Sequence, residues 1–540
     1  MADVTGGGGG GSSAREALSG GKRLPPWGSA PASPGPSPAL LLTLVLVIAT
    51  AGLVYELTMA AVASYLLGDS VRQFSLVIGV YLSALGVGAH LSRHVGKRLG
   101  ATFVDVELCA AVVGGWSAPG LFLTFAYTRL FQVALFSVVT AVGVLVGLEL
   151  PLLLRILERR VEFKELIARA LTFDYAGALV GSVAFSLVLV PRLGLAHTSV
   201  AAGLVNALVA LVAVRTLPPA DADEARALSG ARVRAVVVAL FLLASLFVAG
   251  RATDLAESAI YPGRVVLARQ SPYQRIVVTD HDGATELFLN GNLQFSSRDE
   301  YRYHEALVHP AMAAAASRRT VVVGGGGDGL AVREILRWPT VTSVTLVDLD
   351  HEVTDLARTF APIAGLNRHS LDDPRVAVVN EDAMQWFGET SGTADVVILD
   401  FPDPSTYAVG KLYSTAFYSR VRRHVAPGGA VVVQSSSPFL ANATFSCIVH
   451  TLEAVGFFVR PYQAFVPAFG AWGFALARLE PFSPPDELPP AALRFLDHAA
   501  LAALFALPDD AKPRGAEVNR LDNQALVADY LDEWDRWSGH

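Results

Sequence analysis

Acidic side chains recur after short apolar runs in the second half of the chain. Asp348, Asp382 and Asp400 each end or follow a Val- or Leu-rich segment, and Asp328 lies in a glycine-rich loop after another. If these segments are parallel strands, their carboxyl ends meet at one edge of a sheet, where ligands bind in such folds. Four carboxylates at that edge would attract a cationic ligand.

The loop from Gly324 to Gly329 and the later Asp348 together predict a nucleoside site. Gly325 and Gly327 lack a Cβ atom, so the backbone can approach a ligand closely. Asp348 follows about twenty residues later, the position from which an acid holds ribose hydroxyls. Since Asp328 would repel a pyrophosphate, a sulfonium nucleoside that carries an amine is favoured over a dinucleotide. In the plainer alternative, Asp328 only caps the next helix.

Two carboxylates also lie three positions apart in the segment Asp400-Phe401-Pro402-Asp403-Pro404. A primary alkylamine has a pKa of about 10, close to that of lysine, so at neutral pH it is protonated and not nucleophilic. Asp400 is suited to accept that proton as a general base, and Asp403 to hold a second ammonium group. An ordinary Asp-Pro turn is the alternative.

Alternating strand and helix patterns supply the frame that these residues need. They predict an α/β region with a doubly wound, Rossmann-like parallel sheet, preceded by a small antiparallel β unit with a hairpin at Asp282-Gly283. The strands predicted for the β unit are 265–268, 274–279, 286–290 and 293–296. The elements predicted for the sheet are strands 320–323, 343–347, 376–379, 395–399 and 430–433, and helices from 330, from 352 and over 414–425.

The first half of the chain is far more apolar than a soluble domain. Of the 540 residues, 52% are hydrophobic and only 17% charged, and the mean hydropathy is +0.43. A membrane crossing needs about 20 apolar residues, which predicts an α-helical, multi-span membrane domain of about seven helices. The seven stretches are 39–66, 74–92, 103–127, 131–154, 174–191, 194–215 and 232–250.

Charge and cysteine content exclude several classes of protein. The net charge of −7 gives no basic face, so nucleic acid is not expected as a partner. The two cysteines, Cys109 and Cys447, show no metal-ligand spacing, so neither a disulfide framework nor a metal site is expected. The expected partners are a small-molecule amine, a sulfonium nucleoside and the lipid bilayer, and a homo-oligomer is compatible with the sequence.

Basic residues gather in alternate loops of the apolar half. They are Arg15, Lys22, Arg23, then Arg93, Lys97, Arg98, then Arg155, Arg159, Arg160, Lys164, Arg169, and finally Arg226, Arg232 and Arg234. The positive-inside rule therefore places the N-terminal tail in the cytoplasm, and seven crossings would place the α/β region outside. An even number of crossings, for instance with a re-entrant fifth segment, would keep that region in the cytoplasm.

Five acids lie within or at the edges of the apolar stretches: Glu56, Asp105, Glu107, Glu149 and Asp174. Because a carboxylate in hydrocarbon is costly, one interpretation is a cation or proton pathway inside the bundle. In the other, three of them lie at headgroup level, and Glu56 and Glu149 hydrogen-bond across helices.

From about Ser271 to Leu479, the order and spacing of these motifs resemble the spermidine synthase family, the polyamine aminopropyltransferases, and the apolar half resembles its membrane-fused bacterial members. The matching segments are Ser271-Pro272-Tyr273-Gln274, Leu289-Asn290-Gly291 with Gln294, Arg298 to Glu305, Gly325 to Gly329, Val347 to Asp350, Asn380-Glu381-Asp382 and Asp400 to Pro404.

The resemblance implies that decarboxylated S-adenosylmethionine is the donor and an amine, commonly putrescine, the acceptor. Methylthioadenosine leaves in an S_N2 step, and no further cofactor is implied. On the donor side, this resemblance implies that Gln274 and His304 contact the donor and that Gly325, Gly327 and Asp348 hold the nucleoside. It also implies that Asp328 binds the aminopropyl ammonium and that Asp382 binds the adenine amino group. On the acceptor side it implies that Tyr303 lines the reaction centre, that Asp400 is the base and that Asp403 holds the far amine. Both substrates are cytosolic, which favours a catalytic region on the cytoplasmic face of the cell membrane.

Three features depart from the family pattern and leave the acceptor open. Phe401-Pro402 is bulkier than usual, the loop 467–473 is short and lacks a tyrosine, and the run Ser435-Ser436-Ser437 replaces an acid found in some members. Two other functions are weighed: a methyltransferase on the same sheet, and a membrane polyamine transporter with a soluble sensor domain.

The sequence thus divides into five parts. The expected divisions are a disordered tail over 1–38, the membrane domain over 39–250, the β unit over 251–317, the Rossmann-like domain over 318–480 and a helical packing extension over 481–540.

Overall fold

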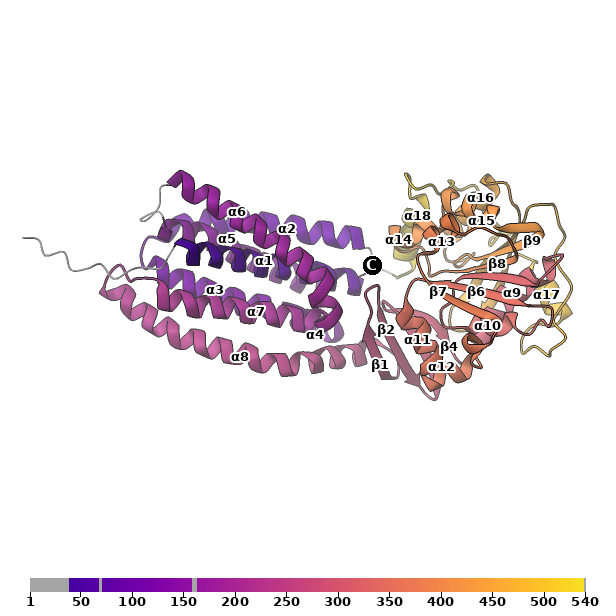
Figure 1. Ribbon diagram of the computed structural model, residues 1–540, viewed down its shortest axis with the longest axis horizontal. Helices are drawn as coiled ribbons and strands as arrows, with labels where there is room; N and C mark the ends of the chain where they lie inside the picture. The colour runs from indigo at the N-terminus through magenta and orange to yellow at the C-terminus, as the bar shows by residue number, and fades with distance from the viewer. Residues whose placement is uncertain (1–37, 68–69, 158–162, 539–540) are drawn as a thin grey trace, which may run out of the picture.

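The computed structural model describes residues 38–67, 70–157 and 163–538. In these ranges a helical bundle and an α/β region lie end to end, joined by the long helix α8 (Ala222–Ile260) (Figure 1). The disordered tail predicted over 1–38 lies outside the described residues except for Pro38, which begins a helix. Five of the basic residues that set the predicted orientation also lie outside the described residues, namely Arg15, Lys22, Arg23, Arg159 and Arg160.

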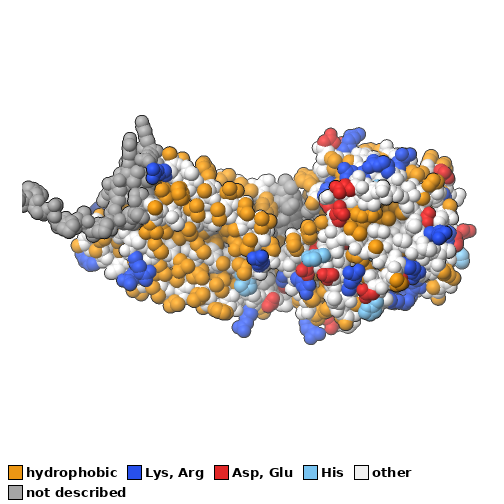
Figure 2. Space-filling view, in the orientation of Figure 1, with side chains coloured by type: hydrophobic (Ala, Val, Ile, Leu, Met, Phe, Trp, Pro, Cys, Tyr) orange, Lys and Arg blue, Asp and Glu red, His pale blue; other side chains and the backbone are white. Residues whose placement is uncertain are grey.

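Long apolar helices build the bundle, and its visible face is covered with hydrophobic side chains (Figure 2). The helices before α8 are α1 (Pro38–Leu67), α2 (Ser70–Leu91), α3 (Leu99–Gly115), α4 (Ser117–Tyr127), α5 (Phe131–Leu157), α6 (Phe163–Ala184) and α7 (Val190–Thr216). Within the described residues, five helical segments are long and apolar enough to cross a membrane, or six if the bent pair α3 and α4 is one span.

One of these five segments, Ile167–Thr216, contains a reversal of the chain. A π-helical turn over Phe185–Leu189 and the non-helical Gly194 separate α6 from α7. Phe173 of α6 and the end of α7 pack in one apolar cluster, whereas Phe185 of the π-helical turn and the start of α7 pack in another. The two helices therefore run in opposite directions. The number of membrane crossings stays a prediction.

The predicted basic loops and the α/β region can be placed relative to each other along the bundle. The loop that carries Arg93, Lys97 and Arg98 lies beside the start of α8, since Arg98 pairs with Asp223 at 3.9 Å. At the opposite end, where α8 enters the first strand, Arg275 forms a bidentate pair with Glu257 at 2.8 and 2.9 Å. The described basic loops and the α/β region thus occupy opposite ends of the bundle (Figure 1).

An antiparallel sheet of four strands in chain order follows α8, as expected for the β unit. Its strands are β1 (Arg264–Gln270), β2 (Arg275–His281), β3 (Ala284–Leu289) and β4 (Asn292–Ser296). The predicted hairpin is confirmed: β2 pairs with β3 across Asp282 and Gly283, which have φ of 50° and 77°. Positive φ at both central residues is the requirement of the tight hairpin turn that such a pair of residues favours.

The main sheet is Rossmann-like and mixed, in the order β10-β11-β9-β8-β5-β6-β7. Its strands are β5 (Thr320–Gly325), β6 (Ser343–Asp348), β7 (Val376–Asn380), β8 (Ala394–Asp400), β9 (Val425–Gln434), β10 (Phe458–Val466) and β11 (Gly470–Arg478). The first five are parallel, as predicted. The strands β10 and β11, which the sequence did not predict, extend the sheet at its edge, and they pair antiparallel because a short turn joins them.

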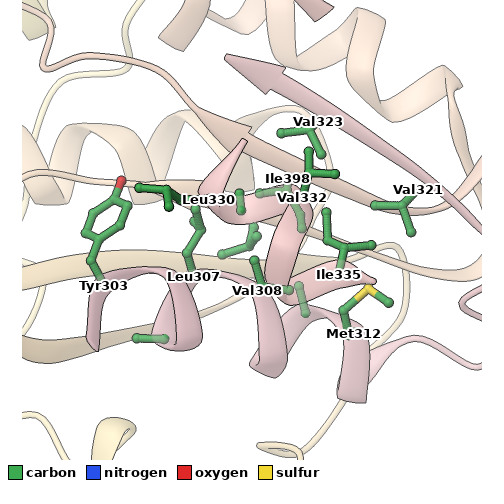
Figure 3. Packing of buried hydrophobic residues seen from close by; sticks show 14 of the residues in the cluster. Tyr303, Leu307, Val308, Met312, Val321, Val323, Leu330, Val332, Ile335 and Ile398 are labelled. Atoms are coloured by element: carbon green, nitrogen blue, oxygen red, sulfur yellow. The ribbon is translucent and has the colours of Figure 1, made fainter. Parts of the chain in front are cut away.

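Helices cover both faces of this sheet over two apolar cores. They are α9 (Glu300–Ala314), α10 (Leu330–Ile335), α11 (His351–Thr359), α12 (Ala361–Leu366), α13 (Ala383–Glu389), α14 (Tyr407–Gly410), α15 (Thr415–Arg423) and α16 (Asn442–Ala454), with α17 (His498–Leu504) and α18 (Ala525–Ser538) in the C-terminal extension. Figure 3 shows Tyr303 at one end of the contact between α9 and the strands β5 and β8. Residues 300–305 lie inside α9.

Candidate active site

The carboxyl ends of β5, β6, β7 and β8 form one edge of the main sheet. The strand register pairs Gly325 with Asp400 and Asp348 with Asn380. The glycine loop and two of the sequence-predicted carboxylates therefore share this edge. Both carboxylates are only half-buried, so they remain within reach of a ligand.

The glycine loop lies so close to Asp348 and Asp400 that no side chain fits at Gly325 or Gly327. Gly325 has a φ of 79°, and a Cβ atom there would lie 2.2 Å from the carbonyl oxygen of Asp400. A Cβ on Gly327 would lie 2.7 Å from Oδ2 of Asp348. Instead, the Gly327 amide donates to that oxygen at 3.0 Å, and the Asp350 amide donates to Oδ1 at 2.9 Å. The Asp348 carboxylate is thus fixed in place, and burial raises its pKa to about 6.

Asp328 combines two of the roles weighed from the sequence. Its Oδ1 accepts the Leu330 amide at 2.8 Å, so the helix-capping alternative describes a real contact. The same side chain interacts electrostatically with Asp348 and Asp400. Burial raises its pKa, which the nearby His304 partly offsets. Capping therefore does not remove Asp328 from the acidic edge.

Asp400 is held by a tyrosine from α9. The Tyr303 hydroxyl donates to Oδ1 of Asp400 at 2.6 Å. The Tyr303 ring lies against Phe469, Trp472 and Phe474, with ring centroids 5.4 to 6.5 Å away. Burial raises the pKa of Asp400 to about 6, so the group is ionised at neutral pH but binds a proton readily. The short loop that lacks a tyrosine thus contributes an aromatic wall.

Asp403 lies among polar groups from two distant segments. Gln434 Nε2 and Ser436 Oγ each lie 3.4 Å from its carboxylate oxygens. Tyr530 of α18 also hydrogen-bonds to it. Burial raises the pKa of Asp403 to about 6, and these hydrogen bonds oppose the rise. The intervening Phe401 is 6% exposed and turns into the apolar core, so its bulk does not fill this space.

A buried ion network supports the start of α9. Arg333 donates to both carboxylate oxygens of Glu300 at 2.8 and 2.9 Å, and His304 Nδ1 donates to the same carboxylate at 2.9 Å. Burial alone would lower the pKa of His304, but the hydrogen bond with Glu300 raises it overall. His304 also interacts electrostatically with Asp328 and Asp400, so the network holds the His304 ring beside the acidic edge.

The β unit contacts the site through Asp350. Gln274 Nε2 donates to Oδ2 of Asp350 at 2.9 Å, and Ser271 Oγ donates to the same oxygen at 2.6 Å. Asp350 in turn caps α11 through the Glu352 amide at 3.1 Å. Gln274 is therefore positioned beside the end of β6, next to the predicted ribose position.

Asp382 differs from the other acids at this edge. Its Oδ1 accepts the Met384 amide at 2.7 Å as the cap of α13, and its other oxygen pairs with Lys411. The neighbouring Glu381 amide donates to the Asp348 carbonyl at 3.1 Å, which ties the end of β7 to that of β6. Three carboxylates, rather than the expected four, thus carry unpaired negative charge along the strand ends.

Three contributors to the site were missed from the sequence: Tyr530, Lys411 and Arg333. Tyr530 lies 127 positions after Asp403 in the chain, and residues 481–540 were interpreted as packing alone. The polar run Asn519 to Gln524 is the sequence feature that indicates a structured role for this extension. In the structure, the buried Asn519 donates to the Gly410 carbonyl at 3.0 Å and anchors the segment before α18.

Known proteins match this chain over most of its length. The family profile of the spermine/spermidine synthase domain matches residues 300–482. The polyamine aminopropyltransferase of Leptospira interrogans is 44% identical over 492 residues, which cover 91% of this chain and 98% of the relative. Polyamine aminopropyltransferase 1 of Ralstonia nicotianae is 46% identical over 518 residues, 94% of this chain and 98% of the relative. A crystal structure of spermidine synthase in complex with the transition state analogue AdoDATO covers 46% of this chain and 86% of its own, at 26% identity and a TM-score of 0.43.

Proposed function

Because the chain belongs to the spermine/spermidine synthase family and is an aminopropyltransferase, we propose that its acidic edge binds two cations and moves one proton. The co-substrate is decarboxylated S-adenosylmethionine, and no metal or other cofactor takes part. The acceptor is a primary diamine such as putrescine.

The donor lies over the glycine loop. Asp348, held by two backbone amides, accepts the ribose hydroxyls with its remaining lone pairs. Asp328 pairs with the aminopropyl ammonium, and Gln274 and His304 flank the donor from the β unit and α9. Asp382 is the proposed partner of the adenine amino group, with Lys411 holding its carboxylate. A donor that kept its own carboxylate would face Asp328 and be repelled, which gives selectivity against ordinary S-adenosylmethionine.

The acceptor approaches along Asp403 and Asp400. Asp403 pairs with the far ammonium, and Asp400 removes a proton from the near one, so that a neutral amine nitrogen is available. That nitrogen attacks the aminopropyl carbon, the carbon–sulfur bond breaks, and its electron pair converts the sulfonium into the neutral thioether of methylthioadenosine. Tyr303 holds Asp400 at the reaction centre. The observation that carries the proposal is the group of half-buried carboxylates Asp328, Asp348 and Asp400, in which Asp328 interacts electrostatically with the other two.

The role of Asp403 is tested with the variant Asp403→Asn. Hydrogen bonds to charged groups contribute about 1.5–3 kcal/mol, so losing this pair is expected to raise the KM for a diamine roughly 10- to 100-fold. The KM for butylamine, which has no second ammonium, should change little. Steady-state formation of methylthioadenosine with both amines measures the difference. An equal rise in KM for both amines contradicts the assignment.

Tyr530→Phe is the matched milder variant. It keeps the ring of Tyr530 and removes only the hydroxyl that bonds to Asp403, so a smaller rise in the diamine KM is expected, with kcat preserved.

The pH dependence follows from the raised pKa values. Asp348, Asp400 and Asp403 each have a pKa of about 6, and each acts in its ionised form. As the pH falls through 6 they take up protons, so kcat/KM should fall at least tenfold per pH unit below that point. Initial rates between pH 5 and 8, on protein that recovers full activity at pH 8, check this. A flat profile from pH 5 to 7 contradicts the role of these groups.

We also propose that the helical bundle lies in the cell membrane and crosses it several times. This proposal is supported by the long apolar helices. The α/β region faces the cytoplasm because both substrates are cytosolic metabolites, although the basic loops at the opposite end of the bundle favour the reverse orientation. A fluorescent protein fused after His540 should fluoresce, and alkaline phosphatase fused there should be inactive. The opposite pair of results places the active site outside the cytoplasm.

A further inference from the structure

Three polar side chains meet inside the helical bundle, away from the acidic edge. Tyr55 of α1, Glu107 of α3 and Glu149 of α5 are at most 1% exposed. Tyr55 interacts electrostatically with both carboxylates, and the two carboxylates interact with each other. Tyr55 belongs to one apolar cluster of the bundle, and the residues beside Glu107 and Glu149 belong to another, so the three groups lie between these clusters, in the interior.

Close helix packing holds the group together. A Cβ atom on Gly114 of α3 would lie 2.7 Å from the Tyr55 ring. Glycine at this position therefore lets α1 and α3 approach until the tyrosine lies against the helix that carries Glu107. Such small-residue contacts are typical of helices packed in membranes.

These groups are left without partners. Neither carboxylate oxygen of Glu107 or Glu149, nor the Tyr55 hydroxyl, has a hydrogen-bond partner among the described residues. The interpretation that Glu149 hydrogen-bonds across helices is thus not met, and Glu107 is buried rather than at headgroup level. Asp105, half a turn from Glu107, shows the contrast: it is exposed and pairs with Arg234. Two buried carboxylates in apolar surroundings stay ionised only where a cation joins them, and are otherwise protonated.

We propose that Glu107, Glu149 and Tyr55 form a binding site for an organic ammonium group, separate from the active site. A primary ammonium has three N–H donors and no acceptor, which fits two carboxylates and a phenol oxygen. The reaction of this chain consumes one such cation and releases another, which makes the acceptor diamine and the polyamine product the two sources.

The test counts amine sites on the full-length chain in detergent. Equilibrium dialysis with radiolabelled putrescine, and separately with spermidine, should give two sites per wild-type chain for at least one of them. The double variant Glu107→Gln and Glu149→Gln should retain one site and keep aminopropyl transfer within twofold. Asp105→Asn, the matched control on the same helix, should keep both sites. If the second site is seen with putrescine, the acceptor diamine is its ligand; if it is seen with spermidine, the polyamine product is.

Two results would overturn the proposal: two sites remaining in the double variant, or displacement of the second site by sodium or potassium ions at the concentration of the amine. If the double variant does not fold, Tyr55→Phe replaces it, with a several-fold weaker second site expected and unchanged affinity contradicting the proposal. Transfer activity is measured in parallel, so a failure of the bundle site is distinct from a failure of the proposed catalytic roles.

Discussion

Asp400→Asn is expected to lower kcat by about 10²- to 10⁴-fold, the range that a positioned general base contributes. The asparagine side chain keeps the size of the aspartate and its hydrogen bond with Tyr303 but does not accept a proton at neutral pH. The attacking amine then stays protonated. Methylthioadenosine formation at saturating amine measures the loss.

The same variant should bind the nucleoside normally. Methylthioadenosine is uncharged and rests on the glycine loop and Asp348, which Asp400→Asn does not alter, so its dissociation constant should stay within about twofold. Tyr303→Phe is the control for geometry: it removes the 2.6 Å hydrogen bond to Asp400 but leaves the carboxylate, and a smaller fall in kcat is expected. Turnover by Asp400→Asn within twofold of wild type contradicts the role of Asp400 as the base.

Arg333→Met is expected to cost about 3–5 kcal/mol of unfolding free energy, because it leaves a buried charge unpaired. The Glu300 side chain is fully buried and depends on Arg333 for two hydrogen bonds, with only His304 as a further partner. Since α9 also carries Tyr303, activity should be lost together with stability. Urea denaturation followed by tryptophan fluorescence measures the change.

Arg264→Met serves as the comparison. Arg264 and Asp280 form an exposed pair at 3.5 Å, with side chains 78% and 44% exposed, and such surface pairs contribute at most about 1 kcal/mol. If Arg333→Met and Arg264→Met lower the unfolding free energy equally, the buried Glu300 network does not stabilise α9 more than a surface ion pair would. A double substitution of Glu300 and Arg333 by Met should recover part of the loss, because no unpaired charge remains.

The strand ends and their carboxylates were readable from the sequence for a physical reason. Buried parallel strands are continuous apolar runs, so a polar residue at the end of a run, such as Asp348 or Asp400, marks the edge where ligands bind. The positions of Gly325 and Gly327 followed from the same pattern, and the backbone contacts at both sites leave no space for a side chain.

Contacts between distant segments were not readable. Tyr530 reaches Asp403 only because the extension after β11 returns across α14 and α16, and no local pattern encodes that path. The edge hairpin β10-β11 was missed because the prediction followed the alternation of strands and helices, which stops after α16. The pairing of Asp382 with Lys411 depends on a helix and a loop that approach only in the folded chain.

The central claim is that the acidic edge accepts a sulfonium nucleoside without a carboxylate and transfers its aminopropyl group. The most direct test incubates the purified chain with decarboxylated S-adenosylmethionine or with ordinary S-adenosylmethionine, each with a panel of amines, and identifies the products by mass spectrometry. We predict methylthioadenosine and an aminopropylated diamine in equal amounts, from the decarboxylated donor alone. S-adenosylhomocysteine with a methylated amine, formed from the ordinary donor, would contradict it.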